Sequence, residues 1–512
     1  MSTHAEDSGK GRRIGFFLGP VVFALMLLLP APEGMKVEAW RVAAVTVFMA
    51  IWWITEAIPI PATSLLPIAL FPLLGIMKSK AATAPYANHL IYLFMGGFFL
   101  AVTMERWNLH KRVAVHTIRL VGTSPGRMIL GFMIATALLS MWVSNTATTM
   151  MMVPIGLAVI QQATGFDSEA LRACGTTGPE SNFGKCLMLG IAYAASIGGV
   201  ATIIGTPPNT VMVGMVDKMF GVEIGFGQWM LFGVPLAVIM LGISWVLLTR
   251  FLFPMGDMQL PGGRKIIDEE LRKLGPMAIE EKKIVVVGCF VASFWLARGF
   301  MKKMPFVLDL MPNFGYIHDA TIGILGSLIL FAIPTNFQKG EFLLDWKTAV
   351  KIPWDVILLF GGGLAIANGF ARTGLASYIA SQLSGLEGAS ILIFVGAVVL
   401  ITIFLTEITS NTATATLLVP IMGSAAIAMG VHPYATIVAA CVAASFAFML
   451  PVATPPNAVV FGSGCMSIKQ MARAGLWLNI VGTMLITGFV VYLLPALWGI
   501  DLHSVPQWAV MP

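Results

Sequence analysis

Charged side chains are scarce in this chain of 512 residues. Asp, Glu, Lys and Arg together make up 11% of it, whereas an ordinary soluble domain carries about 25%. Metal and nucleotide signatures are missing too: no HExxH, Walker or dinucleotide motif occurs, and the cysteines show no CxxC spacing. The five cysteines lie mostly in apolar segments, where thiols serve as small core residues: Cys174, Cys186, Cys289, Cys441 and Cys465. These absences count against an enzyme and against an organic cofactor.

The sequence is instead rich in long apolar runs. Hydrophobic residues make up 57% of the sequence, the mean hydropathy is +0.85, and apolar runs recur from end to end. This pattern is typical of a polytopic helical membrane protein whose surroundings are the lipid bilayer. The net charge of +6 gives no ground to expect a nucleic-acid partner. The longest polar stretch, about Met255 to Lys283, predicts a loop and leaves no room for a separate soluble domain.

One short polar stretch occurs twice inside these runs. Ser144-Asn145-Thr146-Ala147-Thr148 recurs 266 residues later as Ser410-Asn411-Thr412-Ala413-Thr414, and each copy is followed by Val-Pro-Ile. Upstream residues match at the same offset: Phe94, Gly96 and Gly97 with Phe360, Gly362 and Gly363. Two matches at one offset indicate an internal repeat.

The polar stretches predict two re-entrant hairpins. The apolar segments beside the first copy, 127–142 and 147–162, each have 16 residues, about 24 Å as helix against about 30 Å of hydrocarbon. Two half-depth helices that meet at a polar tip fit this length better than two spans. Segments 389–408 and 413–428 form the second such pair. Backbone exposed at that depth is tolerated where it lines a cavity.

Two longer segments carry a break. Segment 185–218 is interrupted by Gly205-Thr206-Pro207-Pro208-Asn209, and segment 434–461 by Ala453-Thr454-Pro455-Pro456-Asn457. Consecutive prolines remove two amide donors and stop a helix. With these, we predict an all-α protein of about eleven transmembrane helices plus two hairpins. The spans are 14–30, 40–58, 62–77, 88–105, 185–218, 228–253, 284–301, 317–334, 355–371, 434–461 and 472–499.

The two copies are predicted to have opposite orientations in the membrane. Five crossings separate matching spans, and an odd number inverts the second copy, as in secondary transporters. With a cytoplasmic N-terminus, 22 of the 31 Lys and Arg residues fall inside, as the positive-inside rule requires, and the C-terminus lies outside. The apolar segment after Lys10 resembles a signal peptide, but Pro30-Ala31-Pro32 is a poor cleavage site, so a retained first span is expected.

This topology predicts five regions. They are an N-terminal tail with the first span (1–39), a first inverted repeat (40–253, with hairpin 127–162 and broken helix 185–218), a cytoplasmic loop (254–283), a second inverted repeat (284–500, with hairpin 389–428 and broken helix 434–461) and an extracytoplasmic tail (501–512).

The repeated tips have the chemistry of an ion and anion site. One such stretch alone would be explained by close helix packing, but two copies, each followed by a Thr-Pro-Pro-Asn break, favour a site. Hydroxyls, amide carbonyls and freed backbone carbonyls are ligands for small cations, and half-helix N-termini suit carboxylates. No Lys or Arg lies beside either tip in the sequence. A bound cation would therefore supply the positive charge that an anionic substrate needs.

These motifs resemble the divalent anion/sodium symporter family. The resemblance is carried by the paired Ser-Asn-Thr and Thr-Pro-Pro-Asn motifs, by the stretch Ser445–Val460, and by Trp52-Trp53-Ile54-Thr55-Glu56-Ala57-Ile58-Pro59. It covers nearly the whole chain. It implies a homodimeric elevator-type carrier of di- or tricarboxylates, usually driven by sodium, in which the hairpins and broken helices carry the substrate across.

The resemblance also implies site residues. The substrate carboxylates would contact Ser144, Asn145, Thr146, Ser410, Asn411 and Thr412, with help from Thr206 and Thr454. One sodium site would use Ser140, Ser144, Asn145 and backbone near Gly198 or Gly199. The other would use Thr406, Thr409, Asn411 and backbone near Ala453.

Several ionisable residues have more than one explanation. Glu407 has no acidic repeat mate, since Met141 occupies that position, and an intramembrane carboxylate is a functional candidate. It would tune a cation site, couple a proton or pair structurally. Glu56 and Asp355 are expected at the membrane interface. His89 and His318, near span starts, are expected to be structural.

The predicted function is sodium-coupled symport of C4-dicarboxylates (succinate, malate, fumarate) across the plasma membrane, in bacteria the inner membrane. A sodium-independent di- or tricarboxylate exchanger and a citrate or sulfate symporter of the same fold stay open as alternatives. An intramembrane hydrolase would need a nucleophile and a base at membrane depth, which the sequence does not offer. A channel is disfavoured, because hairpins that close a site from both sides favour alternating access.

Overall fold

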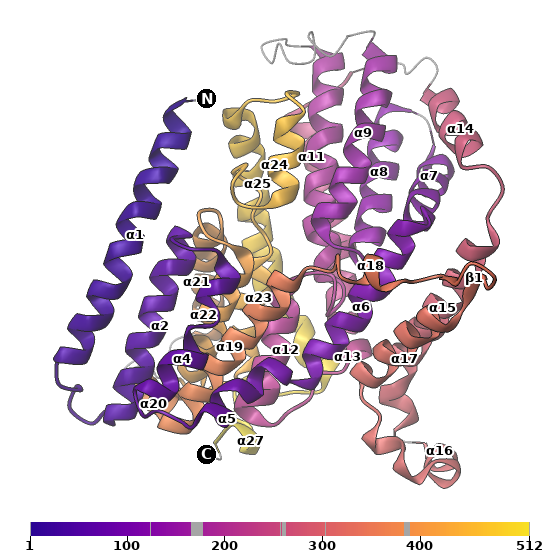
Figure 1. Ribbon diagram of the computed structural model, residues 1–512. Coiled ribbons are helices and arrows are strands. Elements are labelled where there is room, and N and C mark those ends of the chain that lie inside the picture. Colours follow the sequence, from indigo (N-terminus) through magenta and orange to yellow (C-terminus); the bar gives the residue numbers. More distant parts are fainter. Residues whose placement is uncertain are drawn as a thin grey trace.

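The structure is a computed structural model that describes the chain except residues 1, 123, 165–177, 257, 259–262, 303, 383–389, 511 and 512. Its first part consists of helices (Figure 1). In order they are α1 (Ser2–Leu28), α2 (Val37–Thr55), α3 (Ile60–Thr63), α4 (Leu66–Leu73), α5 (Ser79–Thr83), the 3-10 helix η1 (Ala84–Ala87), α6 (His89–Arg106), α7 (Leu109–Val121), α8 (Pro125–Ser140), α9 (Asn145–Thr164), α11 (Pro179–Val200), α12 (Pro207–Phe220), α13 (Phe226–Val246), the π-helix η2 (Leu247–Leu252) and α14 (Gly263–Leu274).

The remaining part adds one small β-hairpin to a further set of helices. In order they are α15 (Ile279–Met301), α16 (Pro305–Leu310), the 3-10 helix η3 (Pro312–Tyr316), α17 (Asp319–Ala332), the antiparallel strands β1 (Pro334–Asn336) and β2 (Glu341–Phe342), α18 (Trp346–Ala349), α19 (Trp354–Thr373), α20 (Leu375–Gln382), α21 (Ile391–Thr406), α22 (Asn411–Ala428), α23 (Tyr434–Ala444), α24 (Pro455–Gly462), α25 (Ile468–Gly488), the π-helix η5 (Phe489–Leu493), α26 (Leu494–Trp498) and α27 (Gln507–Val510).

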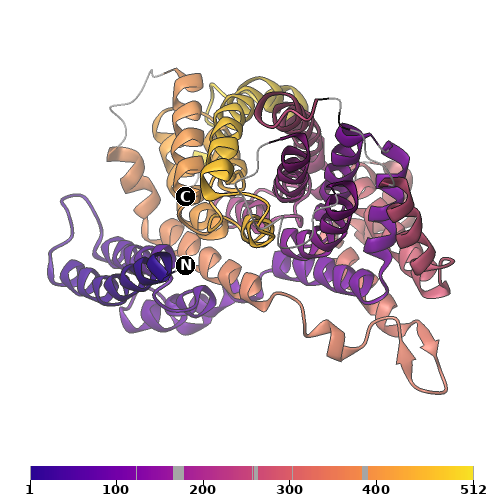
Figure 2. The same ribbon diagram turned by 90° about the horizontal axis from the view of Figure 1, so that it is seen from above.

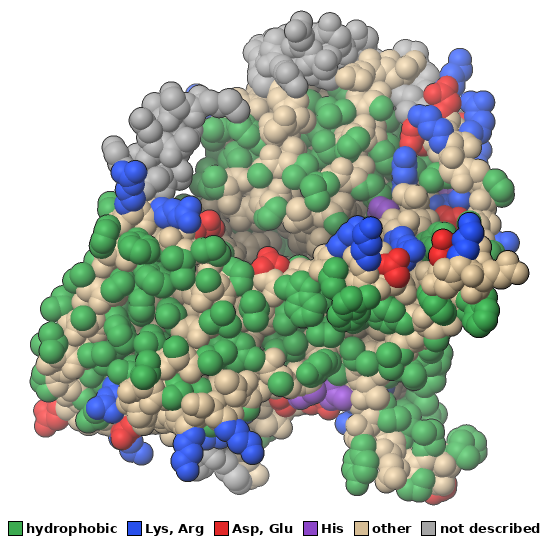
Figure 3. Space-filling model, viewed as in Figure 1, with side chains coloured by type: hydrophobic (Ala, Val, Ile, Leu, Met, Phe, Trp, Pro, Cys, Tyr) green, Lys and Arg blue, Asp and Glu red, His purple; other side chains and the backbone are tan. Residues whose placement is uncertain are grey.

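The helices confirm the predicted fold class. Within the described residues, nine helical stretches are long and apolar enough to cross a membrane, and five shorter apolar helices accompany them. Apolar side chains cover most of the lower half of the face in Figure 3, while Lys and Arg gather at its edges and near α14. The chain is therefore a multi-pass helical membrane protein.

The third predicted span, 62–77, is two short helices. α3 ends at Thr63 and α4 spans Leu66–Leu73. Pro61 and Pro67 stand in the first turns of these helices, and Pro72 lies inside α4. Proline suits a helix start but removes an amide donor further along. The prolines therefore divide a segment that apolar composition alone predicts to be one span.

The predicted loop 254–283 contains a helix, α14. Its polar face pairs with α7, because Lys111 lies 2.9 Å from Glu270 and Arg119 lies 3.1 Å from Asp268. Arg112 of α7 also donates to the carbonyl of Leu274 at the end of α14. Composition alone did not reveal this helix, because its stability comes from contacts with a segment about 150 residues away in sequence.

The two broken helices occupy the centre of the bundle. All of α23 and the segment of α11 from Phe183 to Val200 are buried. Small residues dominate both segments and allow close backbone approach. Helices α1 and α2 pack side by side at one edge (Figure 2). The first hairpin, α8–α9, lies in the upper part of Figure 1, and the second, α21–α22, lies lower, on the side of α2.

Candidate functional site

Both Ser-Asn-Thr triplets stand where a hairpin enters its second helix. α8 ends at Ser140 and α9 begins at Asn145, while α21 ends at Thr406 and α22 begins at Asn411. The hydroxyl of Ser144 accepts a 3.2 Å hydrogen bond from the amide three residues on, as an N-cap does. The first amides of each helix lie before the first helical hydrogen bond, so those that are not capped can donate to an anion.

The tip of the first hairpin contacts the first broken helix through oxygen atoms. The Ser140 hydroxyl donates a 2.7 Å hydrogen bond to the carbonyl oxygen of Ala195 in α11 and also contacts the Asn145 side-chain amide. The same amide lies 3.2 Å from the carbonyl oxygens of Ala195 and Gly205. Groups from the hairpin, α11 and the break thus converge on one point.

This first cluster fits a small cation. When the side-chain oxygen of Asn145 points into the cluster, it lies beside the oxygens of Ser140, Ala195 and Gly205. The Ser140 hydroxyl is then the one hydrogen-bond donor among these four oxygens. Oxygen lone pairs repel unless a cation lies among them, and such oxygens are the ligands of hard cations. With the amide turned over, its nitrogen donates to the same oxygens, so the cluster is satisfied without an ion.

A second cluster has the same construction. The Thr406 hydroxyl lies 2.7 Å from the side-chain oxygen of Asn411 and 2.9 Å from the carbonyl oxygen of Ala444 in α23. Here too, the Thr406 hydroxyl is the one donor among the oxygens of Thr406, Asn411 and Ala444. Thr406 and Asn411 are the repeat mates of Ser140 and Asn145 at the offset of 266 residues, so both clusters join a hairpin tip to a broken helix.

The other residues predicted for the cation sites are placed differently. A Cβ on Gly199 would lie 2.8 Å from the Asn145 side chain, so Gly199 borders the first cluster. Gly198 instead packs on α8, since a Cβ there would lie 2.4 Å from the carbonyl of Ala137. The Thr409 hydroxyl contacts that of Thr414 in its own hairpin at 2.6 Å. Sequence reasoning missed the carbonyls of Ala195, Gly205 and Ala444, because a backbone carbonyl has no signature in sequence.

Each Thr-Pro-Pro-Asn motif starts the second piece of a broken helix. α12 begins at Pro207 and α24 at Pro455, and the threonines before them, Thr206 and Thr454, are buried and extended. The Thr454 hydroxyl accepts a 3.2 Å hydrogen bond from the amide of Asn457. Both threonines therefore lie at helix N-termini, where amide donors can bind an anion.

The asparagine of each motif braces the break, which the sequence analysis did not anticipate. The Asn209 side-chain amide donates to the carbonyl of Thr202 at 2.8 Å. The Asn457 amide donates to the carbonyls of Ala447 and Leu450, both at 3.0 Å. Buried carbonyls of unwound backbone need such partners. The two asparagine side chains therefore stabilise the non-helical backbone of each break.

Helices of the two repeats pack crosswise around the tips. α9 of the first hairpin packs against α24, and α22 of the second hairpin packs against α12. Each hairpin therefore contacts the broken helix of the other copy as well as its own. Helices of both repeats therefore pack together around the two broken helices.

Other ionisable residues have structural roles. Glu56 ends α2 in a left-handed conformation, and Asp355 stands in the first turn of α19. His89 and His318 pack with ring centroids 4.2 Å apart, and His318 lies 3.0 Å from Glu223. Together with an arginine ion pair, the hydrogen bond with His318 holds the pKa of Glu223 well below its usual range. His89 and His318 thus have a structural role, whereas the interfacial position of Glu56 and Asp355 stays a prediction.

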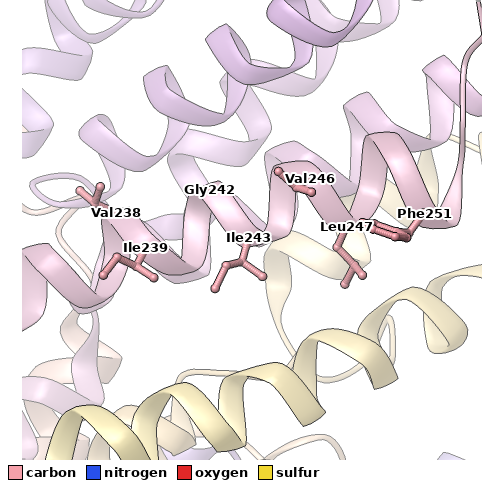
Figure 4. A pocket seen from close by; sticks show the side chains of 7 residues that line it. All are labelled: Val238, Ile239, Gly242, Ile243, Val246, Leu247 and Phe251. Atoms are coloured by element: carbon pink, nitrogen blue, oxygen red, sulfur yellow. The ribbon is translucent and has the colours of Figure 1, made fainter. Parts of the chain in front are cut away.

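A groove of about 430 Å³ lies on α13 and η2, away from both hairpin tips in the sequence (Figure 4). Its lining is apolar, with side chains such as Val238, Ile243 and Phe251. A carboxylate has no donor there, because none of the lining side chains is polar. The groove is therefore not the anion site.

Three comparisons relate the chain to known proteins. The family model described as "Sodium:sulfate symporter transmembrane region" matches residues 12–503. A "Sodium-dependent dicarboxylate transporter SdcS" from Staphylococcus saprophyticus is 45% identical over 495 residues, covering 96% of this chain and 93% of the relative. The protein of that name from Staphylococcus aureus strain RF122 is 45% identical over 505 residues, covering 98% and 95%.

Two solved structures have a similar fold. The YdaH transporter of Alcanivorax borkumensis has a TM-score of 0.53 at 14% identity, covering 89% of this chain and 98% of the other. MtrF of Neisseria gonorrhoeae, titled as one of a class of antimetabolite efflux pumps, has a TM-score of 0.54 at 13% identity, covering 93% and 94%. At this identity the likeness concerns the fold alone.

Proposed function

Because the chain belongs to the sodium:sulfate symporter family, whose model matches residues 12–503, we propose that it is a sodium-coupled symporter of C4-dicarboxylates in the plasma membrane. The proposal goes beyond the family to one substrate class. Relatives 45% identical over almost the whole chain are named sodium-dependent dicarboxylate transporters, which supports that choice.

The observation that carries the proposal is the pair of oxygen clusters beside two helix N-termini. Each cluster combines a hydroxyl, a side-chain amide and a backbone carbonyl, at Ser140 in one repeat and at Thr406 in the other. Two anion-binding helix starts suit a substrate with two carboxylates. Sodium ions in the clusters would neutralise the dianion, since no Lys or Arg lies beside either tip in the sequence.

We assign roles to the tip residues within this proposal. The substrate carboxylates bind Ser144, Asn145, Thr146, Ser410, Asn411, Thr412, Thr206 and Thr454. One sodium ion binds between Ser140, Asn145 and the backbone of Ala195, Gly199 and Gly205. The other binds between Thr406, Asn411 and the backbone of Ala444, with Ala453 and Thr409 beside it.

The proposal includes alternating access by an elevator movement in a homodimer, with a cytoplasmic N-terminus and an extracytoplasmic C-terminus. The mobile part comprises the hairpins and broken helices, which contact one another crosswise. In this proposal, residues 40–253 and 284–500 form the two inverted repeats. Tricarboxylates are proposed as weaker substrates, because the two helix starts match two carboxylates.

Uptake of labelled succinate into proteoliposomes tests the function. We expect an inward sodium gradient to drive accumulation and an equal potassium gradient to give only background. Competition by malate, fumarate, citrate and sulfate then ranks the substrates. Uptake that ignores sodium but requires preloaded dicarboxylate would instead identify an exchanger, and inhibition by sulfate alone would identify a sulfate carrier.

A further inference from the structure

Glu407 is a buried carboxylate at the second hairpin tip, beside Thr406. Its side chain does not join the oxygen cluster but accepts hydrogen bonds from four N–H groups. The amides of Phe448, Met449 and Leu450 lie 2.8–3.1 Å from its oxygens, and the side-chain amide of Asn479 lies at 2.8 Å. These three backbone amides belong to the break between α23 and α24.

The surroundings define what this carboxylate can do. Both of its oxygens face N–H donors, which stabilise a charged carboxylate. A protonated carboxyl would place its own O–H donor among four N–H donors, which cannot accept a hydrogen bond from it. A cation at the carboxylate would be repelled by the positive ends of the same N–H dipoles. The geometry therefore counts against a proton carrier and a cation ligand, two of the roles that the sequence left open for Glu407.

The two repeats connect the hairpin tip to the break through different groups at this position. The repeat mate of Glu407 is Met141, whose backbone carbonyl accepts a 2.6 Å hydrogen bond from the Thr202 hydroxyl. Thr202 and Leu450 correspond, since each precedes its Thr-Pro-Pro-Asn threonine by four residues. The same two positions are thus joined in both repeats, by a neutral bond in the first and by a carboxylate in the second.

The difference follows from the length of the breaks. Six residues, 201–206, separate α11 from α12, whereas ten, 445–454, separate α23 from α24. A longer unwound segment leaves more amides without helical partners. The second break is also contacted by α25, where a Cβ on Gly475 would lie 2.2 Å from the carbonyl of Phe448.

We propose that Glu407 is a positioning residue that fixes the second break to the second hairpin, so that the Ala444 carbonyl, just before the break, faces the second cation site. The consequence for sodium rests on the proposed function. Among the residues that the structure describes, no charged side chain braces the first site in this way. Loss of the Glu407 carboxylate should therefore weaken sodium at the second site while the first site keeps its geometry.

The test uses Glu407→Gln in the full-length protein, with Met141→Gln as the matched control. A glutamine at 407 keeps the size but turns an NH₂ group toward the amides of Met449 or Leu450. At 141 the contact with Thr202 uses the backbone carbonyl, so a change of side chain leaves that contact in place. Asn479→Ala, which removes one donor and leaves the carboxylate charged, serves if Glu407→Gln does not fold.

Hydrogen exchange followed by mass spectrometry measures the brace directly. We expect the peptide that contains 446–450 to exchange about tenfold faster in Glu407→Gln, with a smaller change in Asn479→Ala and none in Met141→Gln. Unchanged exchange in both Glu407→Gln and Asn479→Ala would overturn the proposal. This readout does not depend on transport or on sodium.

Sodium activation of succinate uptake measures the consequence. We expect the half-activating sodium concentration of Glu407→Gln to rise about tenfold, while the KM for succinate at saturating sodium changes much less. An equal loss in both quantities, or the same shift in Met141→Gln, would overturn the proposal. If wild-type uptake ignores sodium, the proposed function fails, and the exchange experiment still decides the role of Glu407.

Discussion

The hydroxyl of Tyr193 in α11 donates a 2.9 Å hydrogen bond to the carbonyl oxygen of Phe448 in the second break. Both side chains are fully buried, and their rings meet edge to face with centroids 5.1 Å apart. The central helix of the first repeat thereby contacts the unwound backbone of the second repeat, so the two broken helices support each other.

We predict that Tyr193→Phe destabilises the protein by about 1 kcal/mol, because the buried Phe448 carbonyl loses a donor while the ring contact stays. Thermal unfolding in detergent measures the loss. Tyr492→Phe is the control, since Tyr492 is 70% exposed. Equal unfolding temperatures for the two variants would contradict this prediction.

Asn145→Ala and Asn411→Ala are each expected to abolish succinate uptake with the fold intact. The side-chain amide of each asparagine belongs to an oxygen cluster and also stands at a helix N-terminus. Alanine has no amide, so it can contact neither the cation nor the substrate. Uptake into proteoliposomes gives the activity, and size-exclusion elution with the wild-type profile shows the fold. Normal transport by both variants would refute the assignment of the site.

Gly199→Ala should weaken sodium activation about tenfold or more. A Cβ at Gly199 would lie 2.8 Å from the Asn145 side chain and 3.0 Å from the Gly205 carbonyl, and thus inside the first cluster. Crowding of this kind typically costs about 1–3 kcal/mol. Gly462→Ala is the matched control, because nothing lies within 4 Å of a Cβ there. The prediction is wrong if sodium dependence is the same in both variants.

Acid is expected to destabilise the end of the bundle near the C-terminus through His432, which contacts Leu502 and Trp508. Burial lowers the pKa of His432 from 6.5 to about 4, although Asp501 opposes the shift. Between these values the unfolded chain binds a proton that the folded protein does not, so stability falls as pH drops from about 6.5 to about 4 and levels off below.

The variant His432→Asn tests this slope. Asparagine can still accept the hydrogen bond that the amide of Tyr434 donates to the His432 ring, but it does not titrate. We expect melting temperatures measured from pH 7 to pH 4 to fall less steeply in the variant. Parallel curves for the variant and the wild type would show that other groups cause the acid sensitivity.

The positions of the hairpin tips could be predicted from sequence because they depend on local chemistry. The first hairpin was expected to turn between 142 and 147, and its helices end at Ser140 and begin at Asn145. The proline pairs likewise marked the starts of α12 and α24. The family resemblance carried by these motifs is confirmed by the match over residues 12–503.

Other features could not be predicted, because they depend on partners far away in sequence. The start of the second break at Ser445, well before its prolines, depends on Glu407 and Asn479. Helix α14 depends on ion pairs with α7. In both cases a polar group is stabilised by a partner that only the folded chain brings near.

The sequence by itself determined that this is a polytopic helical membrane protein with a repeated hairpin and a repeated break. Apolar length, proline pairs and identical motifs are properties of the chain read in order. The tertiary structure alone decided which carbonyls complete the two oxygen clusters and which way Glu407 faces. Hydrogen bonds of this kind join each hairpin to its broken helix 38 to 55 residues away, and a buried polar group must find its partner in space.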